Sequence, residues 1–319
     1  MATVPLTPVD RVEILSLMDN SLDVLMASTP VARRAKLGPD PYLRPQLRAE
    51  HGVSMLITVA RAGRRDALLF DTGVSPDGVL HNLEVLERSL HDIRALVLSH
   101  GHTDHTGGIQ GMLARYARWR LPILVHPDAF LKRRQVREGE ITNLIPPSRA
   151  DLEREGIELV VETGPTFLLE RQVLITGQIP RTTPFEQGMP TQQAWVDGEW
   201  RPDPWIHDDQ AIVIHLRDKG LVVLTGCGHA GVINTIRAAR QLTGVEPVHA
   251  VIGGFHLTGS LFEPVIEPTV AALKAIGPRV LVPQHCTGWK AQLRLAQELP
   301  EAYIPNSVGT TLVLDAQAP

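Results

Sequence analysis

Residues 99–108 read Ser-His-Gly-His-Thr-Asp-His-Thr-Gly-Gly and place three histidines and one aspartate within six positions. An apolar run that is typical of a buried strand comes directly before them. Neutral imidazole nitrogens and a carboxylate are ligands for zinc and similar divalent ions. His100 and His102 alternate, so they can point in one direction. Asp104 and His105 can point in another, and the spacing therefore suits two neighbouring metal ions rather than a polar surface loop with unrelated histidines.

Motifs along the chain resemble those of the metallo-β-lactamase superfamily, whose commonest ligand motif is similar to the His-x-His-x-Asp-His pattern here. Upstream, Asp71-Thr72-Gly73 ends an apolar run and looks like the superfamily's strand ending in Asp-Thr-Gly. Downstream, the segments 225–229, 253–256 and 283–288 fall where its later site loops come. These segments look most like the branch named dihydropterin-ribofuranosylaminobenzene phosphate synthase-like, or simply metal-dependent hydrolases.

The resemblance covers residues 12–314 and implies one α/β domain over residues 1–319. The implied fold is the αββα metallo-β-lactamase sandwich, with two mixed β-sheets flanked by helices and the site on one edge between them. The order of the apolar runs agrees, because strands dominate early and then alternate with helices. Residues 28–50 are expected to form an irregular insertion. Residues 179–205 are expected to form a lid-like loop segment, or else a passive excursion.

The composition is that of an ordinary globular protein, with 43% hydrophobic residues, 21% charged residues and a net charge of −4. Both signs of charge are mixed along the chain, so we expect a small-molecule substrate and no nucleic-acid partner. There is neither an apolar run of about 18 residues nor a secretory signal pattern, so we expect no membrane partner. The only cysteines are Cys227 and Cys286, which fits a reducing cytoplasm.

Two groups in the middle of the chain allow more than one interpretation. Lys132-Arg133-Arg134 is typical of a solvated helix face, with contact to a substrate anion as the alternative. Trp195, Trp200 and Trp205 fit either the wall of a pocket or the contact surface of a homodimer, because aromatic residues serve both uses.

Two metal ions need more ligands than residues 100–105 supply, and polar residues that follow later apolar runs are the candidates. His229 follows such a run across a turn with two glycines, which let the backbone bend sharply. His285 follows another and matches the superfamily's final histidine ligand. The region 176–181 lacks a histidine that many members carry, and Cys227 stands where they have a bridging aspartate. As a thiolate Cys227 suits zinc; the alternative is a small buried residue.

Other polar residues near these turns are candidates for roles around the metals. His256 is a metal ligand, a substrate contact, a proton donor to the leaving group, or a hydrogen-bonded structural residue. Asp71 is expected to accept a hydrogen bond from a ligand imidazole and so to fix its orientation. His51 and His207 are candidate pocket residues.

The implied cofactors are two divalent metal ions, zinc first, with manganese or iron as alternatives. The predicted ligands are His100, His102, Asp104, His105, His229 and His285, with Cys227 as an additional candidate. A divalent ion lowers the pKa of bound water from about 15.7 to about 7, which makes hydroxide available at neutral pH. We therefore expect attack by a metal-activated hydroxide, with Asp104 and His256 as catalytic residues.

The expected reaction is hydrolysis of a small anionic substrate, with a phosphodiester or cyclic phosphate first and a lactone or carboxylic ester second. Predicted helices start after residues 228–231 and 287–288, and free N–H groups there favour an anion. Arg181 is the candidate substrate-binding cation. A non-catalytic metal- or ligand-binding protein with the same fold is the alternative from another class.

Overall fold

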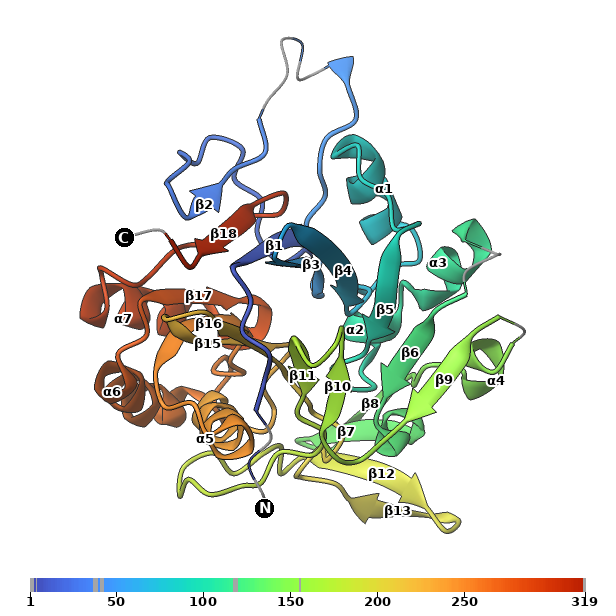
Figure 1. Cartoon of the computed structure of the whole chain (residues 1–319). Helices are drawn as coiled ribbons and strands as arrows, with labels where there is room; N and C mark the ends of the chain where they lie inside the picture. Colours follow the sequence, from blue (N-terminus) through green and yellow to red (C-terminus); the bar gives the residue numbers. More distant parts are fainter. Residues whose placement is uncertain are drawn as a thin grey trace.

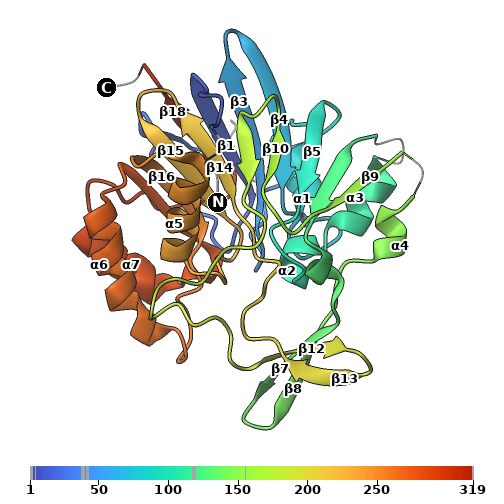
Figure 2. The same cartoon turned by 60° about the horizontal axis from the view of Figure 1, so that its bottom comes forward.

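The core consists of two β-sheets that face each other, and helices cover the outer face of each sheet (Figure 1, Figure 2). The computed structural model describes residues 3, 5–36, 40, 43–116, 120–154 and 156–317. Each of the two sheets contains both parallel and antiparallel pairs. This is the αββα sandwich of two mixed sheets that the sequence predicts.

The first sheet has eight strands within the described residues. In order across the sheet they are β2 (Ala32–Arg33), β18 (Thr311–Asp315), β1 (Arg11–Met18), β3 (Ser54–Arg61), β4 (Arg64–Phe70), β5 (Ile93–Val97), β6 (Pro122–Val125) and β9 (Glu158–Val161). Strands β4, β5, β6 and β9 run parallel. Helix α1 (Gly78–Val85) follows β4, and α2 (Thr103–Thr106) and α3 (Ile109–Arg115) follow β5. Helix α4 (Arg149–Leu152) precedes β9. Leucines of α1 and α3 pack on the outer face of this sheet.

The second sheet has six strands in the part of the chain that the structure describes. In order they are β10 (Thr166–Leu168), β11 (Val173–Ile175), β14 (Ile212–Leu216), β15 (Gly220–Thr225), β16 (Val248–Gly254) and β17 (Val280–Gln284). Strands β15, β16 and β17 run parallel. The helices on its outer side are α5 (Val232–Thr243), α6 (Ile266–Ile276) and α7 (Trp289–Glu298).

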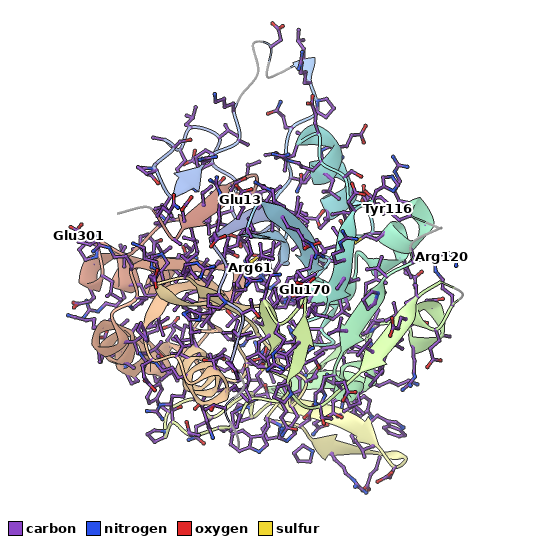
Figure 3. All side chains as sticks on the ribbon, in the orientation of Figure 1. Glu13, Arg61, Tyr116, Arg120, Glu170 and Glu301 are labelled. Carbon is purple, nitrogen blue, oxygen red and sulfur yellow. The ribbon has the colours of Figure 1, made fainter. Side chains whose placement is uncertain are left out.

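The inner faces of the two sheets share one apolar core. Ile57 and Phe70 come from the first sheet, Ile214 and Leu224 from the second, and each is fully buried. Side chains on alternate positions of a strand point to opposite faces, so the same strands also contact the helices. Figure 3 shows that side chains fill the space between the sheets, whereas charged residues such as Glu301 lie at the outer edge.

A third, four-stranded sheet lies below α2 at one end of the molecule in Figure 2, and the sequence does not predict it. Its order is β13 (Glu199–Pro202), β12 (Gln192–Val196), β7 (Arg133–Arg137) and β8 (Glu140–Leu144). The expected lid-like segment therefore contains a hairpin. Asp197 and Gly198, both with positive φ, form its turn, and Trp195 pairs with Trp200 across it. Asp-Gly is a recognised hairpin signal that could have identified it.

The expected insertion and the basic cluster lie outside the centre of the two sheets, and the described helices are short. The insertion expected over 28–50 carries β2, and its residues 37–39 and 41–42 lie outside the described residues. None of the described helices has both the length and the apolar character needed to cross a membrane. The basic cluster 132–134, expected on a helix face, lies at the start of strand β7 instead.

Replacing Ile57 by alanine removes a fully buried side chain from the core between the sheets. We expect the free energy of unfolding in urea to fall by about 2–5 kcal/mol, because the cavity forms where both sheets are rigidly packed. The matched control is Ile141→Ala, since Ile141 is 54% exposed in β8. Equal effects of the two substitutions would contradict the assigned core.

Candidate metal centre

The predicted ligands gather because several parallel strands end at the same edge of the sandwich. His100 follows β5, His229 follows β15 and His285 follows β17. Asp71 follows β4, and His256 follows β16. In open α/β sheets, functional side chains collect at the carboxyl ends of parallel strands. The local sequence therefore delivers polar side chains from both sheets to one place.

His100, His102 and His229 form a three-histidine group. The Nε2 atom of His100 and the Nδ1 atom of His102 each lie 3.2 Å from Nε2 of His229. Nitrogens bound to a tetrahedral zinc at 2.0–2.1 Å are about 3.3 Å apart, so this spacing fits one ion. Burial lowers the pKa of His102 to about 4 and the pKa values of the other two well below the ordinary value. The three imidazoles are therefore neutral near pH 7.

A second group lies beside the first and contains one carboxylate and two imidazoles, those of Asp104, His105 and His285. Asp104 Oδ2 lies 3.2 Å from His285 Nε2 and 3.7 Å from His105 Nε2. The His285 Nε2 atom is buried and makes no hydrogen bond. Burial raises the pKa of Asp104, but His105 and His285 outweigh burial and hold it well below its usual range. The group therefore offers one carboxylate and two imidazoles to a second cation.

Cys227 lies between the two groups. Its Sγ atom is 3.1 Å from His105 Nε2. It lies within 4.8 Å of ligand atoms of both groups: those of Asp104, His105 and His285, and those of His100 and His229. Burial raises the pKa of this thiol, but a thiol that coordinates a metal loses its proton. The structure therefore brings the additional candidate ligand together with the six others.

Three imidazoles are oriented by hydrogen bonds from the ring nitrogen that points away from the two groups. His105 Nδ1 donates to Asp71 Oδ2 at 2.6 Å, and His285 Nδ1 donates to Asn20 Oδ1 at 2.9 Å. Ser99 Oγ gives its proton to Asp71, so it accepts from His100 Nδ1 at 2.9 Å. The Nε2 atom of each of these three imidazoles faces the groups. Burial lowers the pKa of His105, but the Asp71 and Asp104 carboxylates outweigh burial and raise it to about 9, so a metal ion that binds its Nε2 displaces a proton. Such outer partners fix the tautomer of metal-binding histidines.

Asp71 joins the ends of β4 and β5. Its carboxylate accepts hydrogen bonds from the Ser99 N–H and hydroxyl, both at 2.7 Å, besides the one from His105. The residue is fully buried and has a φ of 59°, which few residues other than glycine adopt. A Cβ at Gly226 would lie 2.1 Å from Ser99 Oγ, so only glycine fits against this contact.

A buried ion pair supports residues 99–105, the histidine loop, through a hydrogen bond to its backbone. The sequence does not predict this ion pair. Arg133 donates to both oxygens of Asp208, at 2.7 and 3.0 Å, and to Asp203 at 2.7 Å. Asp208 also accepts from the Gly101 N–H at 2.8 Å. The Arg133 and Asp208 side chains are 2% and 0% exposed. The cluster that was expected to be solvated therefore contributes a structural cation, whose partner is 75 residues away in sequence.

The start of α5 is already occupied by a side chain. Glu186 accepts hydrogen bonds from the Ile233 and Asn234 N–H groups, both at 2.8 Å, and from the Thr183 hydroxyl at 2.9 Å. A Cβ at Gly231 would lie 2.1 Å from Glu186 Cδ. The free N–H groups that the sequence predicts here for an anion are therefore bonded to the protein's own carboxylate.

The remaining predicted residues lie at different distances from the centre. The His256 ring packs against the His229 ring at an angle of 48°, with ring centroids 4.3 Å apart. His51 lies at the exposed side, with Nε2 3.8 Å from Asp104 Oδ2. His207 contacts Gln178 instead, at 2.9 Å. Arg181 donates to the backbone carbonyls of residues 179, 205 and 206, so its predicted substrate contact stays a prediction.

Comparisons with known proteins agree with this geometry. The family model described as "Metallo-beta-lactamase superfamily" matches residues 47–242, more than half of the chain, which therefore belongs to this superfamily. The chain is 30% identical over 260 residues to the 7,8-dihydropterin-6-methyl-4-(beta-D-ribofuranosyl)-aminobenzene-5'-phosphate synthase of Methanocaldococcus jannaschii, covering 80% of this chain and 87% of that protein. This similarity bears out the branch that the sequence motifs indicate.

Two solved structures share the fold. The structure of Tm1679, described as a metal-dependent hydrolase of the beta-lactamase superfamily, has a TM-score of 0.71 at 24% identity and covers 95% of this chain and 99% of its own. YhfI from Bacillus subtilis, a metallo-beta-lactamase fold protein, has a TM-score of 0.51 at 13% identity, with coverage of 95% and 99%. At these identities the likeness shows the αββα fold.

Replacing Asp71 by asparagine removes the carboxylate that holds His105 and Ser99. We expect affinity for zinc to fall about 10- to 100-fold, because His105 loses the partner that fixes its tautomer. Competition against a chromophoric chelator measures the affinity. Asp77→Asn is the control, since the Asp77 side chain is 72% exposed. Unchanged affinity in the Asp71 variant would refute this role.

Replacing Arg133 by methionine leaves Asp208 buried without its cation. We expect the free energy of unfolding to fall by about 3–5 kcal/mol, because an unpaired buried charge is strongly destabilising. Urea denaturation measures the change. Arg137→Met, on the exposed end of the same strand, should cost less than about 1 kcal/mol. A tolerated Arg133→Met variant would show that Asp208 does not depend on this pair.

Proposed function

We propose that this member of the metallo-β-lactamase superfamily is a metal-dependent hydrolase that holds two divalent metal ions, with zinc the first choice and manganese or iron the alternatives. One observation carries the proposal. Three imidazoles donate from their outer nitrogens, so their inner nitrogens face the two groups and are the atoms available to a metal ion. A structural histidine cluster has no need of this arrangement, whereas metal ligation does.

The residues present divide naturally between two ions. His100, His102 and His229 would hold one ion. Asp104, His105 and His285 would hold the other, and Cys227 reaches both groups. A thiolate is a soft ligand that favours zinc over manganese, so Cys227 supports zinc as the first choice. The histidine that many superfamily members carry in the region 176–181 is not needed for three imidazoles to meet.

Divalent metal ions supply Lewis acidity, which makes hydroxide available from water near neutral pH. Asp104 is the group best placed to orient this hydroxide and accept its proton, because its side chain is 22% exposed whereas His105 and His285 are fully buried. His256 lies next to His229 and has a buried Nδ1 atom without a hydrogen bond. That atom is free to exchange a proton with a leaving group, which is the role we propose for it.

For the substrate we favour a small phosphodiester or cyclic phosphate, with a lactone or carboxylic ester as the alternative. The name of the curated relative denotes a phosphorylated product, which supports a phosphate-bearing substrate. Glu186 fills the start of α5 and Arg181 contacts carbonyls, so the attraction for an anion would come from the metal ions. We further propose that the substrate is a small molecule. We also propose a cytoplasmic location, because both cysteines are free. The homodimer expected through the tryptophans also stays a proposal.

Elemental analysis together with a hydrolysis screen tests this function. We expect about two zinc, manganese or iron ions per chain, and turnover of bis-4-nitrophenyl phosphate in preference to a 4-nitrophenyl ester or a lactone. His102→Ala should abolish turnover and release about one ion, because three imidazoles share that ion.

His91→Ala is the matched control, since His91 is an exposed histidine away from the centre. Preference for the ester or lactone would replace the phosphodiesterase assignment. Neither bound metal nor turnover after metal supplementation would refute the hydrolase and leave a non-catalytic binding protein.

A further inference from the structure

A pocket of about 170 Å³ adjoins the three-histidine group. His229 and His256 form part of its wall, so anything in the pocket lies next to the predicted metal ligands. The rest of the wall comes from residues 185–190, from Gly228 and Gly231, and from five residues between positions 255 and 265, before α6. The pocket therefore joins the expected lid-like segment to the second sheet.

The wall is apolar and offers no cation. Phe185, Met189, Leu261, Phe262 and Val265 contribute apolar side chains. Among the described residues that line the pocket there is no lysine or arginine. The one acidic residue, Glu186, accepts three hydrogen bonds from α5 and Thr183. The pocket is thus unsuited to a phosphate and suited to an uncharged group.

The volume of the pocket and its aromatic side chains narrow the class of occupant further. An apolar cavity of about 150 Å³ binds one benzene molecule, so this pocket matches a single six-membered ring. His256 and Phe262 meet edge to face, with ring centroids 4.5 Å apart, and present an aromatic wall.

We propose that this pocket is the specificity pocket of the enzyme and takes an uncharged, ring-sized apolar group of the substrate. Leu261 and Phe262 are the residues that determine this preference. The inference rests on the proposed function, because the position of the pocket beside His229 identifies its occupant as the substrate's own non-reacting group. The substrate is then a phosphoester that carries an aryl or similar uncharged ring, rather than a purely polar phosphate.

Phenol binding tests the pocket without any need for turnover. Phenol is uncharged near pH 7, and we expect saturable binding in the millimolar range by saturation-transfer NMR. Leu261→Asp places a charge in the wall at a residue that is 47% exposed, and should abolish binding. Leu293→Asp, at a 52% exposed leucine of α7, should leave it unchanged. Absent binding, or equal binding to the Leu261 variant, would overturn the proposal.

Two phosphonates with the same headgroup test the link to the metal centre. We expect the metal-loaded protein to bind phenylphosphonate at least about tenfold more tightly than methylphosphonate, because only the former buries a ring. In Leu261→Asp the ratio should fall to about one. A ratio near one in the unaltered protein would count against the pocket. Failure of the hydrolase proposal is detected by a different experiment, in which the protein would hold no metal and show no turnover.

Discussion

The structure depends on the hydrogen bonds of one buried carboxylate, that of Asp71. They tie the end of β4 to the start of the histidine loop and also set the tautomer of His105. An aspartate at a left-handed φ is strained, and such strain persists only where its surroundings determine the conformation. Gly226, from the second sheet, packs against the same contact. One constraint thus joins both sheets to the metal centre.

The centre is assembled from distant segments because its candidate ligands follow strands of both sheets. The first sheet brings Asp71, His100 and His102, and the second brings Cys227, His229 and His285. The inter-sheet core therefore sets the distances between ligands. The third sheet adds an outer support, since Arg133 in β7 holds Asp208 beneath Gly101. A close-packed interior transmits small displacements, so a shift in the core between the sheets would also move the candidate ligands.

Much of this arrangement could be predicted from the sequence, because the ligands follow apolar strands and carry a recognisable pattern. The αββα fold was implied by the resemblance to the superfamily. His100, His229 and His285 could be identified as candidate ligands because each follows an apolar run that forms a strand. The pairing of Arg133 with Asp208 could not be predicted, since no local pattern links residues so far apart. The capping of α5 by Glu186 is equally non-local. The hairpin turn at residues 197–198 was readable from its Asp-Gly pair.

The carboxylate of Glu186 at the start of α5 has a consequence for how the protein responds to its surroundings. A vacant helix N-terminus attracts phosphate whether or not a metal is present. Here that attraction is already neutralised from within the chain. The start of α5 therefore offers these two N–H groups to no phosphorylated compound, with or without metal at the candidate centre. Under the proposed function, attraction for a phosphorylated substrate would have to come from the metal ions, so its binding would follow metal supply.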